Sequence, residues 1–147
     1  MRPSIHATRP RDLRDDAIHT LVRYGVNDQG SSPLIMTEVR HAGGAIRATS
    51  GDASPIGHRD VDYVLSLVAV TPTPETQQAV AAHVAAFKAD LAPALDGVYM
   101  NFLDGDETRT CTKDAYAQAH FQKLMQLKAR YDPQDRFCHS FNIPVAA

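Results

Sequence analysis

Apolar residues recur with the period of a helix in three segments of the chain. In the first, residues 12–24, they lie on one side of the predicted helix and charged residues lie on the other. In the second, Thr73 is the predicted N-cap, Pro74 occupies the first turn, and the helix continues to about Leu91. The third covers residues 114–131. The pattern therefore predicts three amphipathic helices.

Other segments are rich in β-forming residues. Residues 33–40 and the longer run 61–70 predict two strands, and the longer one is expected to be central in a sheet. Between them, residues 41–57 are rich in glycine, alanine, serine and threonine, which predicts a long connection with a short strand at 45–49.

Residues 98–102 predict a further strand with two different faces. Alternation places its three apolar side chains in the core and Tyr99 with Asn101 on the other face. A phenol and an amide need hydrogen-bond partners if they are buried, and otherwise they are free to contact a ligand. This second face is the first candidate for a functional site.

The order of these elements predicts a single α+β domain over residues 1–147, with a small, mostly antiparallel sheet and helices packed on one face. The strands at 61–70 and 98–102, with the helix between them, fit a crossover within one sheet. The first helix is expected to pack on elements later in the chain, because the residues before it offer no partner. The tail, residues 136–147, has spaced apolar residues and is expected to fold back along the sheet.

Charge and composition exclude several classes of function. The formal net charge is −2, with 15 basic and 17 acidic residues intermixed, so the chain has neither the basic stripe of a nucleic-acid-binding protein nor a polybasic membrane patch. The first six residues lack the apolar core of a signal peptide, and no segment approaches the roughly 20 apolar residues of a membrane span. We expect a cytoplasmic protein without nucleic-acid or membrane partners, in which Cys111 and Cys138 are reduced thiols.

Metal-binding and nucleophile motifs do not occur in the sequence. None of the seven histidines has the spacing of a zinc site. The acidic residues Asp104, Asp106 and Glu107 fit a solvated turn better than a calcium loop. We therefore predict no metal site.

Tyr99, Asn101 and the pair His58–Arg59 remain as candidates. A tyrosine has a pKa of about 10 and acts as a base only beside a cation or a donor that favours the phenolate, which His58 or Arg59 would supply. In the alternative interpretation, Tyr99 is a structural residue whose hydroxyl is hydrogen-bonded, and Arg59 pairs with a nearby aspartate.

Several segments resemble, in the same order, the berberine bridge enzyme-like, FAD-linked oxidases. Residues 99–104, Tyr-Met-Asn-Phe-Leu-Asp, resemble the family's Y-x-N-Y-x-D segment. Residues 131–137 and 140–144 resemble its C-terminal K-x-x-Y-D-P-x-N-x-F and N-x-N-I-P segments, and residues 43–45 and 58–63 resemble parts of its substrate domain. The chain is thus similar to the second half of the substrate domain plus the C-terminal segment.

The resemblance implies a small-molecule substrate and FAD, which in this family is held mainly by an N-terminal domain absent from residues 1–147. It also implies roles for single residues. Tyr99 would be catalytic and would contact the substrate together with His58 and Arg59, whereas Asn101 and Asn142 would contact the cofactor.

Two positions depart from the family pattern. Many members have a tyrosine, in some of them the base, where this chain has Phe102, and phenylalanine accepts no proton. Ser140 replaces the first asparagine of N-x-N-I-P. These departures argue against catalysis by the family's usual tyrosine.

The resemblance leaves two interpretations of the function. In the first, the chain is the substrate-binding part of an FAD-linked oxidoreductase and needs a partner chain that carries the flavin. In the second, it is a flavin-free module that binds a small ligand or forms a homodimer. Both predict a homo-oligomer in isolation, because a half-domain without its neighbour exposes an apolar face.

Overall fold

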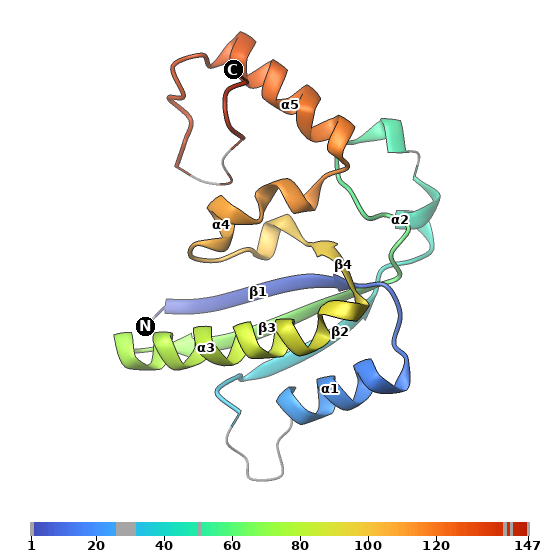
Figure 1. The fold of residues 1–147 in the computed structure, drawn as a ribbon, viewed down its shortest axis with the longest axis vertical. Helices are drawn as coiled ribbons and strands as arrows, with labels where there is room; N and C mark the ends of the chain where they lie inside the picture. Colours follow the sequence, from blue (N-terminus) through green and yellow to red (C-terminus); the bar gives the residue numbers. More distant parts are fainter. Residues whose placement is uncertain (1, 26–31, 50, 140, 142, 147) are drawn as a thin grey trace.

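A four-stranded sheet lies at the centre of the computed structural model, which describes residues 2–25, 32–49, 51–139, 141 and 143–146 (Figure 1). The strands stand in the order β2-β3-β1-β4, and every neighbouring pair is antiparallel. Their bounds are Arg2–Pro10 for β1, Met36–His41 for β2, Tyr63–Thr71 for β3 and Leu95–Val98 for β4. The predicted α+β fold is confirmed.

β1 is the strand that was not predicted. Polar residues occupy both of its faces, with Ser4, His6 and Thr8 on one side and Arg9 on the other, so no apolar alternation marks it as a strand. It nevertheless lies inside the sheet, where Ile5 pairs with Val68 of β3 and Thr8 pairs with Val98 of β4. The residues before the first helix therefore belong to the sheet, and the expectation that they offer no partner was wrong.

Two βαβ units interlock to form the sheet. The first is β1, α1 (Asp15–Gly25) and β2; the second is β3, α3 (Pro74–Leu91) and β4. Each unit holds one strand of the other between its own two strands, because β3 lies between β1 and β2, and β1 lies between β3 and β4. The predicted crossover through the second helix is confirmed, with β1 inserted in its middle.

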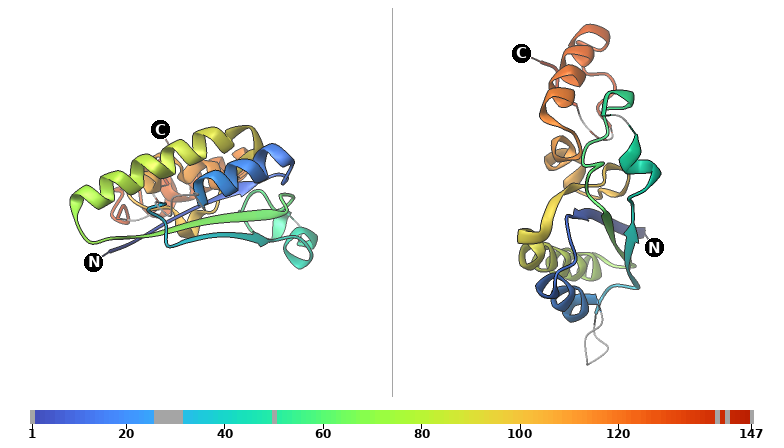
Figure 2. Two further views of the ribbon diagram at one scale, coloured as in Figure 1. Left: turned by 90° about the horizontal axis from the view of Figure 1, so that it is seen from below. Right: turned by 90° about the vertical axis from the view of Figure 1, so that its right-hand side faces the viewer.

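Helices α1 and α3 lie side by side on one face of the sheet (Figure 2), as predicted. α3 begins with a capping box in which Thr73 and Thr76 exchange side-chain to backbone hydrogen bonds. The stripe of α3 that faces the sheet is fully buried and consists of Val80, Val84, Phe87 and Leu91. It packs against Leu65 and Leu67 of β3 and against Ala17 of α1 to form the main core.

Two of the shorter predicted strands were wrong. Residues Ala45–Ala48 form the one-turn helix α2 instead of a strand, in agreement with the helix propensity of alanine and arginine. The strand expected at 98–102 ends at Val98 because the chain turns into a 3-10 helix at Met100–Phe102, where Asn101 and the following Asp104–Gly105 pair favour turns.

The last helix begins later than predicted. A short helix α4 (Glu107–Thr110) and a 3-10 turn (Thr112–Ala115) precede it, and α5 extends over Gln118–Tyr131. None of the described residues of α5 is fully buried. The helix projects away from the sheet in Figure 1.

The tail does not follow the sheet, which corrects the expectation for residues 136–147. The carboxylate of Asp132 accepts hydrogen bonds from the amides of Arg136 and Phe137, at 2.8 and 3.0 Å, and from Lys128. These bonds turn the chain sharply after α5. The described tail residues contain no strand and stay beside α5 (Figure 1).

Candidate active site

Tyr99 lies where the chain leaves the edge of the sheet. Its amide donates to the carbonyl of Ala7 at 3.3 Å, and its ring lies 5.5 Å from that of Phe102. Both rings pack against a small cluster of Ala7, Ala42 and Val64. Val64 precedes Leu65 of the main core, so alternation along β3 places this cluster on the face opposite α1 and α3. We call this the open face of the sheet.

Arg9 is the cation beside Tyr99. Its guanidinium carbon lies 5.9 Å from the centre of the Tyr99 ring, and only 2 % of the residue is exposed. Nη2 donates to the carbonyl of Val61 at 3.2 Å, while the buried Nε has no hydrogen-bond partner among the described residues. Burial lowers the pKa of Arg9, Tyr99 and Asp60 oppose this shift, and Arg59 adds to it. The site therefore contains a buried guanidinium whose hydrogen-bonding capacity is incompletely used.

Sequence reasoning missed Arg9, because it expected the cation to be His58 or Arg59. Arg9 reaches Tyr99 through the pairing of β1 with β4, in which Arg9 stands opposite Gly97. That pairing joins residues far apart in the chain. The signal that would have found it is the alternation of Ala7 and Arg9 on one face of a strand, which the polar character of β1 conceals.

A small cavity of about 40 Å³ connects the predicted residues Tyr99 and Asn101 with Arg9. The remaining walls come from two segments, Ile56–Gly57 and Ala115–Tyr116, together with Val98 and Met100. Asn101 is exposed at the rim. Asn142, the other predicted cofactor contact, lies outside the described residues.

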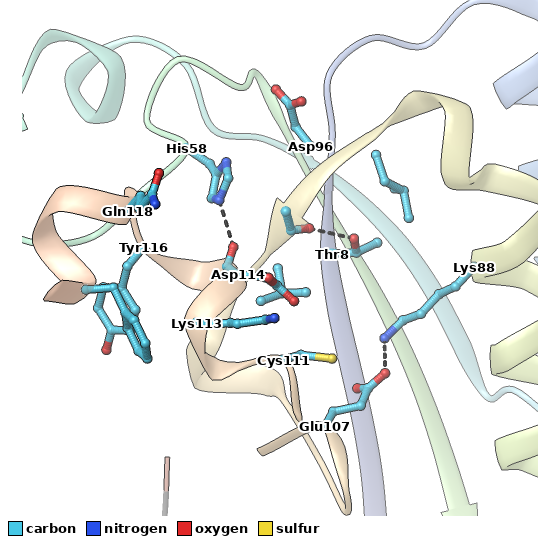
Figure 3. A pocket seen from close by; sticks show the side chains of 14 residues that line it. Thr8, His58, Lys88, Asp96, Glu107, Cys111, Lys113, Asp114, Tyr116 and Gln118 are labelled. Carbon is cyan, nitrogen blue, oxygen red and sulfur yellow. Dashed lines mark hydrogen bonds and ion pairs between the residues drawn. The ribbon is translucent and has the colours of Figure 1, made fainter. Parts of the chain in front are cut away.

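His58 holds a loop in place beside β4. Its backbone is in the left-handed region, with φ of 56°, and its Nε2 lies 2.7 Å from the carbonyl oxygen of Asp114. The ring covers Gly97 so closely that a Cβ there would collide with it. His58 lines a different, larger groove from Tyr99 (Figure 3). The structure therefore does not bring these two residues into one cavity, and a substrate contact by His58 stays a prediction.

Arg59 follows His58 and faces yet another depression, of about 310 Å³. Its Nε is buried and has no hydrogen-bond partner among the residues that the structure describes. The aspartate pairing considered for Arg59 is not found at Asp62, which instead pairs with Arg47 at 3.1 Å. The charge of Arg59 acts on Arg9, the guanidinium beside Tyr99.

The larger groove, of about 610 Å³, contains a second cluster of charged groups on the helix side of β1 (Figure 3). At one end of it, Glu107 of α4 binds both Lys88 of α3 and His6 of β1, the latter with Nδ1···Oε2 of 2.8 Å. Burial alone would raise the pKa of Glu107, but the hydrogen bonds from His6 and Lys88 outweigh it and lower the pKa to about 2. This ion-paired cluster fastens α4 to the sheet and to α3.

The described part of the chain contains neither a cluster of metal ligands nor a membrane-spanning helix. Within those residues, no three histidine, cysteine or carboxylate side chains gather as they would around a metal ion. Among the same residues, no helix is both long and apolar enough to span a bilayer. Cys111 and Cys138 are both free thiols.

Comparison with known proteins gives a family match in the C-terminal third of the chain. Residues 98–144, which contain Tyr99, Asn101 and most of the tail, match the family described as "Berberine and berberine like". An FAD-linked oxidoreductase of Dictyostelium discoideum is 28 % identical over 89 % of this chain, and the glucooligosaccharide oxidase of Sarocladium strictum is 28 % identical over 95 %. The chain spans 28 % and 31 % of those two proteins, respectively.

Solved structures share the fold over the whole chain. A carbohydrate oxidase from Microdochium nivale superposes with a TM-score of 0.75 at 19 % identity, and a variant of BBE-like 1 from Physcomitrella patens superposes with 0.82 at 17 %. Each match covers 99 % of this chain but only 33 % and 31 % of the other protein. The family match and the two relatives confirm the resemblance inferred from the motifs, and the solved structures show the shared fold.

Proposed function

We propose that the chain forms the substrate-binding part of a berberine-like FAD-linked oxidoreductase. Its similarity to the C-terminal part of these proteins is the reason. The observation that supports this most directly is the position of Tyr99 and Asn101 at one cavity on the open face of the sheet, with Arg9 beside them. Two of the matched proteins are named as oxidases of carbohydrates, so we propose a carbohydrate as the substrate.

The described residues do not fit FAD as its sole holders. A pyrophosphate is commonly held by a glycine-rich turn that leads into a helix, and here Gly43–Gly44 leads only into the four-residue helix α2. The oxidation therefore belongs to an assembly in which another segment or a partner chain binds the flavin. In that assembly, the 147 residues of this chain contribute the part of the substrate site that contains Tyr99.

In this assembly, Tyr99 would orient the substrate and not act alone as a base. Its ring contacts both the ring of Phe102 and the guanidinium of Arg9, and these contacts limit its motion. Phe102 takes no proton, so proton transfer at the family's usual position is excluded in this chain. Binding and orientation are the functions that these side chains can perform by themselves.

Two titrations of the purified chain test the proposal. In the first, oligosaccharides of glucose are added and followed by isothermal calorimetry, and we expect saturable binding. In the second, FAD is added and the flavin absorbance band is followed through gel filtration, and we expect FAD to elute separately. Failure to bind any oligosaccharide would contradict the substrate-binding role. FAD that elutes together with the chain would contradict the proposal that another segment or a partner chain binds the flavin.

A further inference from the structure

The guanidinium of Arg9 is buried without enough acceptors. Only 2 % of Arg9 is exposed, and its hydrogen bond to Val61 is the one that the described residues provide. A buried charged donor without a partner is costly, and such groups are normally satisfied by protein, water or ligand. The Nε of Arg9 is therefore an open position for an acceptor.

The surroundings favour an acceptor that carries negative charge. Three groups act electrostatically on Arg9, namely Tyr99, Asp60 and Arg59. Asp60 is the one carboxylate among them, and it faces two guanidinium groups. The Nε of Arg59 also lacks a partner within the described part of the chain. The cavity beside Arg9 measures about 40 Å³, which is room for one carboxylate group or one water molecule.

From this arrangement we propose that the site binds an acidic sugar, with the carboxylate of a uronic or aldonic acid in the cavity between Arg9 and Tyr99. A carboxylate accepts hydrogen bonds from a guanidinium in matched geometry, which a sugar hydroxyl does not do as strongly. Arg59 lines the adjacent depression, which shares Ile56 and Gly57 with the cavity. From there its positive charge adds to that of Arg9. The inference rests on the proposed role as a carbohydrate-binding part and narrows its substrate class.

The test compares two disaccharides that differ at one group, which is a hydroxymethyl group in one and a carboxylate in the other. Cellobiose and the matching disaccharide that ends in glucuronate are titrated into the chain by calorimetry at equal ionic strength, with acetate as the control for a free carboxylate. We expect the acidic disaccharide to bind about 10- to 100-fold more tightly than cellobiose, as a charged hydrogen bond in a partly enclosed site implies. In Arg59→Gln we expect most of this preference to disappear, whereas Arg109→Gln, on the exposed side of α4, should keep it.

Each other outcome is decisive. Equal affinity for the two disaccharides overturns the acidic-sugar site and leaves the carbohydrate-binding role intact. A preference that survives in Arg59→Gln, or in Arg9→Met where that variant folds, places the carboxylate elsewhere and overturns the site. Binding of neither disaccharide contradicts the proposed function itself. Because Arg59 is partly exposed, its variant decides the question even if Arg9→Met does not fold.

Discussion

Tyr99 has surroundings that come from its own turn and from two distant strands. Arg9 arrives from β1, Phe102 from the turn after β4, and Val64 from β3. The sequence predicted Tyr99 itself and the need for a cation beside it. It could not predict Arg9, because strand pairing over so many residues leaves no trace in a local pattern.

The role of Tyr99 can be separated from that of an ordinary buried tyrosine. Tyr99→Phe removes one hydroxyl at the cavity, so we expect oligosaccharide binding to weaken about fivefold, as the loss of one hydrogen bond implies. Tyr63→Phe is the matched control, since Tyr63 packs against His41 at the start of β3 and does not line the cavity. Calorimetry of both variants is the measurement, and equal effects would remove Tyr99 from the site.

Glu107 gives the protein a specific dependence on pH. Its pKa in the folded state is about 2, below the ordinary value of 4.5, so its contribution to stability is present above about pH 4.5 and is lost as the pH falls towards 2. Glu107→Gln should cost about 1 to 3 kcal/mol at neutral pH and should flatten the acid limb of the stability curve.

Urea unfolding between these pH values measures the effect of Glu107→Gln. Asp106→Asn is the control, because its carboxylate is exposed and its pair with Arg109 lies on the surface, so its stability should change by less than about 0.5 kcal/mol. An acid limb as steep in Glu107→Gln as in the original chain would show that the cluster with His6 and Lys88 does not stabilise the fold.

Secondary-structure elements were predictable where their signals are local. The cap at Thr73 and the apolar stripe of α3 identified that helix almost to the residue, and the run of β-formers identified β3. The end of β4 at Val98 and the strand β1 depend instead on partners elsewhere in the sheet. Residues with high strand propensity after Val98 form a turn, which shows tertiary context overriding propensity.

The junction between β4 and the His58 loop supplies a prediction for an element. Gly97→Ala places a methyl group against the His58 ring, so the loop or the strand must shift, and we expect a loss of about 2 kcal/mol in unfolding free energy. Gly51→Ala, which adds a methyl group in open space, should be nearly neutral.

A double variant tests the cause of that loss. Gly97→Ala combined with His58→Ala removes the collision, so its destabilisation should be smaller than the sum of the two single changes by about 1 kcal/mol. Strict additivity in thermal or urea unfolding would mean that the His58 ring is not what limits position 97.

The whole molecule exposes large apolar side chains in its last helix, tail and edge strand. Tyr131 is 72 % exposed, Phe137 85 % and Ile35 67 %, the last directly before the edge strand β2. Exposed apolar groups of this kind are normally covered by another surface. We propose that the isolated chain self-associates until a flavin-bearing part replaces the contact.

Light scattering at micromolar concentration checks this proposal. We expect a dimer or larger species for the original chain and a shift towards monomer for the double variant Ile35→Ser, Phe137→Ser. Ala82→Ser, on the exposed side of α3, is the control and should leave the size unchanged. A clean monomer for the original chain would contradict the proposal.

The position of β1 in the middle of the sheet has a consequence for synthesis. β1 is made first of the four strands, but its neighbour β4 is completed last, nearly ninety residues later. At about 5 to 20 residues per second, a ribosome needs roughly 4 to 18 s to cover that distance, and both edges of β1 lack their native partners for most of it. This topology therefore predicts slow folding, because the paired strands are far apart in the chain. It also predicts a long-lived nascent chain that is sensitive to chaperones.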